Sequence, residues 1–350
     1  MSKYDAFSRS FQLPPAMRPY LKLIATEQEI DLVLGLEERP LTREEIAESL
    51  RISQDEADHL LRGAWKRDIV RRIPEGDQVR YAPGQFYANL DYLSAYETGS
   101  WRRLPSTVRS EVAEWQLQQF IEMWRPAIEE VVRDPGAWMP IKNRDVLLLE
   151  EALELVEASE HVCLLPCQCK TTLCPDSPKI EGSMRLGERA RLTLEQGQGR
   201  SLTADQAKAH LLHLDRMGLI HTGPRQWREH DPGLEWISHG NCHPSYSFPF
   251  LAGQRLGLGK RYPRAHYAAA IDWDRCTHCG ICVGRCLFGA FYQDGTEVRL
   301  HGQARRQVMY DEDRCWGCGL CANACPEMAI EMRPLSWTTT RGEMEKPIPI

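Results

Sequence analysis

Two copies of one cysteine pattern in the last quarter of the chain constrain its fold more than any other feature. The first copy is Cys276-x2-Cys279-x2-Cys282-x3-Cys286, and the second, 39 residues further on, is Cys315-x2-Cys318-x2-Cys321-x3-Cys325. The surrounding residues repeat as well, because Asp-Arg precedes each run and an alanine, Ala290 or Ala329, follows each at the same offset. Four cysteines within eleven residues, present twice, indicate metal-binding loops whose ligands are thiolates.

The spacing within each run fits a cubane iron–sulfur cluster. Three cysteines two residues apart can surround one cluster in a tight loop, and a remote fourth completes the set of four thiolates. Zinc sites more often use two separated Cys-x2-Cys pairs, so a zinc site or a disulfide knot explains this pattern less well. The two runs therefore predict a pair of [4Fe–4S] clusters.

The stretch from about residue 271 to residue 332 closely resembles the bacterial two-[4Fe–4S] ferredoxin module. In that module the fourth cysteine of each run binds the other cluster. The resemblance implies that cluster 1 is held by Cys276, Cys279, Cys282 and Cys325, and cluster 2 by Cys315, Cys318, Cys321 and Cys286. One departure is Leu287, where the commoner module has a proline; Pro326 keeps this proline after the second run. Four glycines are expected to let backbone N–H groups approach sulfur and to accept unusual dihedral angles: Gly280, Gly284, Gly317 and Gly319.

Length and composition indicate a globular protein of two or three domains. The chain has 350 residues, of which 42% are hydrophobic and 26% charged, which is ordinary for a globular protein. Its net charge of −6 gives no overall electrostatic case for nucleic-acid binding. We see no secretory segment and no apolar run long enough to span a membrane, and we expect a cytoplasmic protein whose cysteines bind metal. Oxygen-sensitive clusters favour a role in anaerobic metabolism.

Residues 20 to 85 contain the pattern of a helix-turn-helix followed by a hairpin. Capping boxes at Thr42 and Ser53, each with glutamate three residues later, predict helices over 43–50 and from 54 to about 66. Alternating residues over 68–72 and 79–82 predict two strands. This arrangement resembles a winged helix, which implies either DNA binding through the second helix or protein docking.

The second of these helices carries mostly acidic charge. Asp55, Glu56 and Asp58 oppose the attraction to phosphates that drives DNA binding. We therefore favour a structural or protein-docking module, although Arg71 and Arg72 near the wing keep DNA binding open. Residues 86–160 then show helical patterns, strongest over 110–123 and 143–158, with Pro126, Pro135 and Pro140 expected to interrupt the helices. This region is interpreted as a brace without chemistry of its own.

A second group of cysteines lies upstream of the tandem runs. Val162 to Leu165 predicts a short buried strand, and Pro166-Cys167-Gln168-Cys169-Lys170 follows, with Cys174 close behind and Cys242 much later. In an extended loop Cys167 and Cys169 would point the same way. The segment resembles a Pro-Cys-x-Cys-Arg/Lys motif of anaerobic electron-transfer proteins, which also precedes a two-cluster module. The further cysteine common in that motif is missing from residues 181–184, and Cys242 is the natural replacement.

We therefore predict a third [4Fe–4S] cluster on Cys167, Cys169, Cys174 and Cys242. Two alternatives stay open: zinc on the same four thiolates, or reduced cysteines with a structural role. Cys163 is a possible alternative ligand, but its apolar strand favours a buried, inert thiol.

The rest of the chain shows no sign of another cofactor. Gly253, Gly257 and Gly259 with Lys260 fail the spacing of a phosphate-binding loop. No Gly-x-Gly-x-x-Gly opens a helix after a strand, so we expect no flavin or nicotinamide site. His210 and His213 lie on a helix predicted to begin at a Thr203 capping box, and they are interpreted as packing residues. Asp294-Gly295, between Phe291-Tyr292 and 298–300, predicts a β-hairpin.

The expected fold class is α+β in a multidomain chain, with a mainly helical N-terminal half and a C-terminal bacterial dicluster ferredoxin fold. The predicted parts are a winged-helix-like domain (1–85), a helical brace (86–160), a domain with the third cluster (161–265), the two-cluster domain (266–333) and a tail (334–350). The tail is interpreted as disordered or as an arm around a partner.

The leading hypothesis is a non-catalytic electron-transfer protein or subunit that relays electrons through two or three [4Fe–4S] clusters to or from a partner oxidoreductase. Arg275, Arg285 and Arg314 are expected to raise reduction potentials and attract acidic partners. The resemblance implies a hetero-oligomer of an anaerobe with a flavoprotein, a tungsten or molybdenum enzyme, or a heterodisulfide-reductase-like assembly. Two alternatives remain: a redox-sensing winged-helix transcription regulator, and an iron–sulfur enzyme whose third cluster has an open iron.

Overall fold

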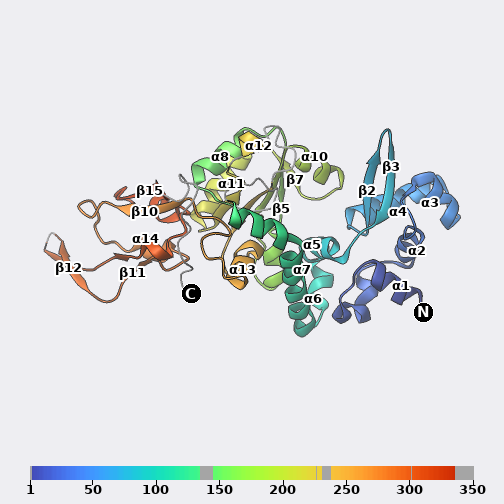
Figure 1. The fold of residues 1–350 in the computed structure, drawn as a ribbon, viewed down its shortest axis with the longest axis horizontal. Helices are drawn as coiled ribbons and strands as arrows, with labels where there is room; N and C mark the ends of the chain where they lie inside the picture. Colours follow the sequence, from blue (N-terminus) through green and yellow to red (C-terminus); the bar gives the residue numbers. More distant parts are fainter. Residues whose placement is uncertain (1, 135–144, 226, 231–237, 301, 336–350) are drawn as a thin grey trace. The chain divides into compact units, whose positions relative to one another are not determined.

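The computed structural model describes residues 2–134, 145–225, 227–230, 238–300 and 302–335. They mix helices and strands throughout (Figure 1), as the α+β prediction requires. The chain divides into two compact units. The first comprises Met1–Glu122, Pro166–Ile180 and Thr193–Gln198, and the second comprises Met123–Leu165, Glu181–Leu192 and Gly199–Ile350. No helix of the described part is long and apolar enough to cross a membrane.

These two compact units run across the five parts predicted from the sequence, and the boundaries of those parts stay a prediction. Pro166–Ile180, which carries the Pro-Cys-x-Cys motif, packs with the N-terminal unit. The region predicted as one domain over 161–265 is therefore divided between the two units. The predicted tail begins at Pro334, and residues 336–350 lie outside the described residues.

The first unit begins with helices around an apolar core. α1 (Lys3–Ser10), α2 (Glu27–Gly35), α3 (Arg43–Leu50) and α4 (Gln54–Lys66) precede a three-stranded antiparallel sheet in the order β1 (Leu41–Thr42), β3 (Gln78–Pro83), β2 (Val70–Glu75). The capping boxes predicted at Thr42 and Ser53 are confirmed, since each hydroxyl accepts the N–H three residues later. Buried side chains from all these helices form the core, among them Phe7, Ile30, Ile46 and Leu61.

The predicted helical brace is helical up to Arg133. α5 (Phe86–Ala95) and α6 (Thr98–Arg103) lead into the long helix α7 (Ser106–Arg133). Pro126 does not end α7, contrary to the prediction; buried Ile121, Ile128 and Val131 lie on either side of it, and their packing offsets the hydrogen bond that proline removes. Pro135, Pro140 and residues 143–144 lie outside the described residues. The helix expected over 143–158 begins later, at Leu149, because Asp145 and Val146 form a strand.

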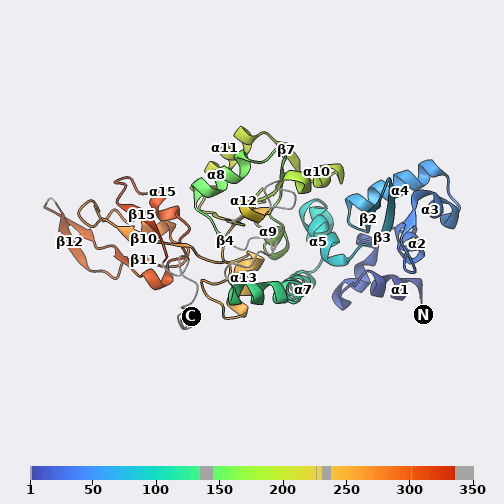
Figure 2. The same cartoon turned by 45° about the horizontal axis from the view of Figure 1, so that its top comes forward.

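The second unit is built on a six-stranded antiparallel sheet. The strand order is β4 (Asp145–Val146), β8 (Ile220–Gly223), β9 (Ser238–Cys242), β6 (Ser183–Leu186), β5 (Val162–Leu165) and β7 (Arg200–Leu202). The helices α8 (Leu149–Glu157) and α11 (Ala204–Arg216) lie side by side (Figures 1 and 2) and pack on one face, against Leu164 and Met184. The strand at 162–165 and the Thr203 capping box are confirmed.

The opposite face of this sheet carries two of the upstream cysteines. Register pairs Cys163 with Arg185, Arg185 with Ser238, and Cys242 with Ile220. Because neighbouring residues of a strand point to opposite faces, Cys163 and Cys242 share a face that α8 and α11 do not cover. Beyond this sheet, α13 (Phe248–Arg255) leads toward the tandem cysteine runs.

The segment with the tandem runs, here called the tandem-cysteine module (residues 266–335), closes on itself. Its first strand, β10 (Tyr267–Ile271), pairs antiparallel with its last, β15 (Ile330–Pro334). Between them, α14 (Ile281–Arg285) and α15 (Leu320–Asn323) occupy equivalent places in the two runs. The two halves are therefore repeated in structure as they are in sequence.

The connection between the runs is a longer hairpin than predicted. β11 (Phe291–Tyr292) pairs with β14 (Met309–Tyr310), and β12 (Glu297–Leu300) pairs with β13 (Gln303–Arg306). The hairpin predicted at Asp294-Gly295 is wrong, because the chain reverses between Leu300 and Gln303. The Asp294 side chain instead accepts the N–H of Thr296 at 2.9 Å, in the bend between β11 and β12.

Candidate metal centres

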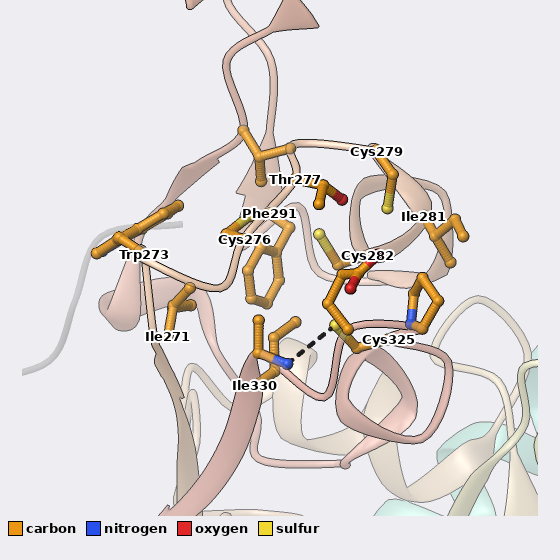
Figure 3. A pocket seen from close by; sticks show the side chains of 15 residues that line it. Ile271, Trp273, Cys276, Thr277, Cys279, Ile281, Cys282, Phe291, Cys325 and Ile330 are labelled. Carbon is orange, nitrogen blue, oxygen red and sulfur yellow. Dashed lines mark hydrogen bonds between the residues drawn. The ribbon is translucent and has the colours of Figure 1, made fainter. Parts of the chain in front are cut away.

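The four thiols predicted to hold cluster 1 line one pocket (Figure 3). Cys276, Cys279, Cys282 and Cys325 lie around about 400 Å³ of space between protein atoms, part of it open to solvent. Three come from the first run, and Cys325 comes from the segment after α15. Every residue that lines this pocket lies between Ile271 and Ile330. The fourth cysteine of the second run therefore meets the first run, as the two-cluster arrangement requires.

The four thiols predicted to hold cluster 2 are also neighbours. Burial, together with the nearby thiols of Cys318, Cys315 and Cys286, raises the pKa of the Cys321 thiol. Burial and the proximity of Cys315 and Cys286 likewise raise the pKa of the Cys318 thiol to about 12. Cys286 belongs to the first run, so the exchange of fourth cysteines is reciprocal. None of the eight cysteines of the tandem runs forms a disulfide.

Backbone N–H groups point at the two exchanged cysteines. The Ala290 N–H donates to Sγ of Cys286 at 3.2 Å, and the Ala329 N–H donates to Sγ of Cys325 at 3.3 Å. The two alanines occupy equivalent positions of the repeat. Such N–H···S bonds stabilise negative charge on a cluster and its thiolates, and they help to set the reduction potential. The repeat of Ala290 and Ala329 in the sequence was the signal for these bonds.

Positive φ angles shape the loops that carry the ligands. Gly280 (φ 78°) and Gly319 (φ 77°) precede α14 and α15, and Gly317 has φ 65°. A Cβ on Gly317 would lie 2.1 Å from the Tyr267 carbonyl oxygen, so only glycine lets β10 approach this loop. At the equivalent place in the first run, His278 has φ 51° and accepts the Val308 N–H at 3.1 Å. Gly284 differs from the prediction: it lies within α14, its φ is not positive, and a Cβ there would meet nothing within 4 Å.

The chemistry of these two thiol sets fits [4Fe–4S] clusters. Burial and the neighbouring Cys276 and Cys279 raise the pKa of the Cys282 thiol to about 11. At neutral pH such a thiol keeps its proton unless a metal replaces it, so binding of iron releases protons. Among the described side chains, no three His, Cys, Asp or Glu converge closely enough to hold a single metal ion. The four thiols around the cluster 1 pocket instead surround a space.

The upstream cysteines are held in a short helix and in the sheet. Cys167 is the residue just before α9 (Gln168–Leu173), Cys169 lies in the first turn of this helix, and Cys174 follows its last residue. The extended loop expected for this segment is therefore wrong. The Thr171 N–H donates to the Cys167 carbonyl at 3.0 Å and the Cys174 N–H donates to the Lys170 carbonyl at 2.8 Å, which closes the helical turns.

Cys242 ends β9 in the second unit and is buried, with its Sγ 3.3 Å from the Thr222 hydroxyl oxygen. Because Cys167, Cys169 and Cys174 belong to the first unit, the four-ligand set for a third cluster stays a prediction. Cys163 is fully buried, and burial raises the pKa of its thiol to about 11. A Cβ on Gly199 would lie 2.5 Å from the Cys163 Sγ, so this thiol is tightly packed.

Asp215 and Asn323 contact each other near the tandem runs and were not identified from the sequence. The end of α11 contacts both cysteine-bearing helices: Asn323 donates to Asp215, and Arg285 donates to the carbonyl oxygens of Arg216 and Asp215. Among the arginines expected near the clusters, Arg275 donates to the Glu327 carbonyl and Arg314 pairs with Asp311. His210, interpreted as a packing residue, has Nε2 2.7 Å from the Glu181 carbonyl oxygen.

Comparison with known proteins identifies the class of the module. Residues 275–329 match the family model of the 4Fe-4S dicluster domain. No curated protein matches the chain, and no solved structure matches it either. The matched residues are a small part of the chain, so they define the class of the module and not a family for the whole protein. The match implies [4Fe–4S] clusters and supports iron–sulfur electron transfer.

Proposed function

We propose that this chain is an electron-transfer protein or subunit that relays single electrons through [4Fe–4S] clusters to or from a partner oxidoreductase. Cluster 1 is held by Cys276, Cys279, Cys282 and Cys325, and cluster 2 by Cys286, Cys315, Cys318 and Cys321. One observation carries the proposal: each set of four thiols lies together, with the fourth cysteine exchanged between the runs, in a segment that matches the dicluster domain.

The residues of the module hold and tune the clusters. The thiolates bind iron, the Ala290 and Ala329 N–H groups stabilise charge on the exchanged sulfurs, and burial limits solvation. Each bound cluster supplies a site that accepts or gives one electron. In this proposal the substrate chemistry belongs to the partner: a flavoprotein, a tungsten or molybdenum enzyme, or a heterodisulfide-reductase-like assembly of an anaerobe, with this chain as a cytoplasmic subunit of the hetero-oligomer.

A third cluster on Cys167, Cys169, Cys174 and Cys242 extends this proposal, on the strength of the sequence motif. Iron and acid-labile sulfide, counted in protein prepared without oxygen, test it. Three clusters require about twelve of each per chain, and two require about eight. About eight irons with one zinc would assign zinc to the upstream thiols, and no EPR signal from the reduced protein would reject the electron-transfer function itself.

We also propose that α2, α3, α4 and the β1-β3-β2 sheet form a winged helix that docks protein. Asp55 and Glu56 are exposed at the start of α4, where they would repel phosphate. Arg72 near the wing lies over the Trp65 ring at 4.4 Å, and Arg43 pairs with Glu44 and Asp58. These contacts occupy guanidinium groups that a DNA-binding surface would present.

The redox-sensing transcription regulator is the second candidate function, and a DNA-binding assay separates the two. Binding of the holoprotein to duplex DNA is measured at several salt concentrations. The docking proposal expects weak binding with a shallow salt dependence. Tight binding that falls steeply with salt, and that weakens in Arg71→Ala, would favour the regulator.

A further inference from the structure

The two sides of the tandem-cysteine module differ in what surrounds them. On the cluster 1 side, Cys279 is exposed and the pocket is formed by the module alone. Three large apolar residues on this side are exposed to solvent: Trp273 is 47% exposed, Ile281 43% and Met328 71%. Trp273 and Ile281 also line the pocket (Figure 3), and Met328 follows the lining residue Glu327. Exposed apolar side chains gathered at a redox site mark a contact surface for a partner.

On the cluster 2 side, the residues beside the ligands pack against the sheet. Trp316 follows Cys315, Phe288 lies two residues after Cys286, and their rings stack with centroids 4.9 Å apart. The Phe250 ring of α13 lies 5.2 Å from Trp316. These side chains and Cys318 pack on a buried cluster that contains Cys242, Ile220 and Leu320. The cluster 2 ligands Cys315 and Cys321 are only 7% and 8% exposed.

Hydrogen bonds fix the module in this orientation within the second unit. The Lys260 ammonium donates to the Glu312 carbonyl oxygen at 2.7 Å, just before the second run. Arg285, next to Cys286, donates to the Arg216 carbonyl oxygen at 2.7 Å, and Asn323 donates to Asp215 at 2.9 Å. The side of the module with cluster 2 is thus held toward the sheet face that carries Cys242.

We propose that the two cluster sites have unequal roles: cluster 1 exchanges electrons with a partner protein, at the surface formed by Trp273, Ile281 and Met328, and cluster 2 exchanges them inside the chain, toward Cys242. The inference rests on the proposed electron-transfer function. Electron transfer slows steeply with distance between redox centres, so the site with an exposed ligand serves the partner. Each transfer moves one electron, which the partner's redox centre loses when the chain gains it, or the reverse, and no bond forms or breaks.

The charges around this surface indicate the kind of partner. Asp272, Asp274 and Glu327 are exposed carboxylates next to Trp273 and Met328 in the chain, with the exposed guanidinium of Arg275 among them. An apolar centre with an acidic rim fits a one-electron redox protein that carries basic side chains around an exposed cofactor edge. We propose a basic partner in place of the acidic partner expected from the sequence, because Arg285 donates to α11 and Arg314 pairs with Asp311.

EPR of the reduced holoprotein tests the order of the two sites. A soluble dysprosium complex is added, and the relaxation of each cluster signal is followed by power saturation. Cys279→Ser and Cys318→Ser variants assign the signals to cluster 1 and cluster 2. The dysprosium complex should raise the spin-relaxation rate of cluster 1, and this rise should be at least about three times the rise measured for cluster 2. An equal or larger effect on cluster 2 would overturn the order, whereas a sample without any cluster signal would count against the proposed function instead.

Electron transfer to cytochrome c, a basic one-electron acceptor, tests the contact surface. In stopped-flow measurements, Trp273→Lys and Met328→Lys should slow oxidation of the reduced protein at least about fivefold at low salt, and salt should slow the native protein. The matched control is Met217→Lys, because Met217 is 51% exposed but follows α11 and does not line the cluster 1 pocket. Equal rates in Met328→Lys and Met217→Lys would overturn the assignment of this surface.

Discussion

The side-chain amide of Asn323 donates a hydrogen bond to Oδ1 of Asp215 at 2.9 Å. Asn323 lies between Cys321 and Cys325 of the second run, and Asp215 lies near the end of α11. Arg285, next to Cys286 of the first run, donates to the backbone oxygen of the same Asp215 at 2.5 Å. Asp215 of α11 therefore contacts both cysteine-bearing helices, through its carboxylate to Asn323 and through its backbone oxygen to Arg285. Loss of the carboxylate removes the contact with Asn323 and the weaker ion pair with Arg285, so we expect it to loosen the module at both runs.

Asp215→Ala should destabilise the module and its clusters. The Asp215 side chain is 7% exposed, and removal of its carboxylate leaves the Asn323 amide and the nearby Arg285 guanidinium with fewer acceptors. A hydrogen bond to a buried charged group contributes roughly 1.5–3 kcal/mol, so we expect a loss of about 2 kcal/mol. Thermal unfolding followed by visible cluster absorbance measures it.

Asp205→Ala is the matched control for this prediction. Asp205 is in the first turn of the same helix, but its side chain is 93% exposed, with one surface ion pair to Lys208. Surface pairs of this kind contribute little. Equal loss of cluster stability in the two variants would show that Asp215 does not anchor the module.

His239 should make the protein less stable as the pH falls from 7 to 5. It is fully buried on β9, and burial, reinforced by the nearby His221, lowers the pKa of His239 to about 3. An unfolded histidine has a pKa of about 6.5, so below this pH the unfolded state binds a proton that the folded state does not. The free energy of unfolding then falls by up to about 1.4 kcal/mol per pH unit, or about 2 kcal/mol at pH 5.

Urea unfolding midpoints measured between pH 5 and 7 check this effect. His239→Gln cannot take up the proton in either state, so its stability should vary less with pH than that of the native protein, whatever its absolute stability. The same slope in both proteins would mean that His239 is not the responsible group.

Local sequence patterns predicted the elements that depend on local interactions. The Thr42 and Ser53 capping boxes fixed where α3 and α4 begin, because each is formed within four residues. The spacing of the cysteines in the two tandem runs predicted which thiols lie together, because the same ligand pattern occurs twice in the chain. The hairpin predicted at Asp294-Gly295 was wrong because the Asp294 side chain accepts the Thr296 N–H and forms only a local bend. The strands that pair, β12 and β13, are joined further along the chain, after Leu300.

Tertiary contacts could not be read from the same patterns. Nothing in the residues from Gln168 to Leu173 predicted a helix rather than a loop. The hydroxyls of Thr171 and Thr172 lie 3.0 Å and 3.2 Å from the Ser94 hydroxyl, which is 77 and 78 residues away in the chain. The sequence around Asp215 gives no sign of a special role, because its partners, Arg285 of α14 and Asn323 of α15, lie far away in the chain. Residues whose role depends on distant partners carry no local signal.

Thr222→Val should lower the reduction potential of the proposed third cluster. The Thr222 hydroxyl oxygen lies 3.3 Å from the Cys242 Sγ and 3.2 Å from the Gly240 carbonyl oxygen. The Thr222 hydroxyl donates to the Gly240 carbonyl oxygen here, but a Cys242 thiolate bound to iron has no proton of its own and can accept this hydroxyl proton instead. A hydroxyl that donates to a ligating sulfur stabilises the extra electron of the reduced cluster, and valine removes this donor while keeping the branched shape. A redox titration followed by EPR measures the shift. A shift of the signals of clusters 1 and 2 alone would count against Cys242 as a ligand of a separate centre.

Gly317→Ala should cost the protein cluster 2, whereas Gly284→Ala should not affect it. Gly317 has a left-handed φ of 65°, and an added Cβ would lie 2.1 Å from the Tyr267 carbonyl oxygen, so β10 or the ligand loop must move. Gly284 lies within α14, where an added Cβ meets nothing within 4 Å and alanine favours the helix. Iron per chain should fall by about four in Gly317→Ala, with loss of the cluster 2 EPR signal, and stay unchanged in Gly284→Ala. Full iron content in Gly317→Ala would show that the close approach of β10 is not needed to shape the second run, and equal iron loss in both variants would point to a general sensitivity of the module to added side chains.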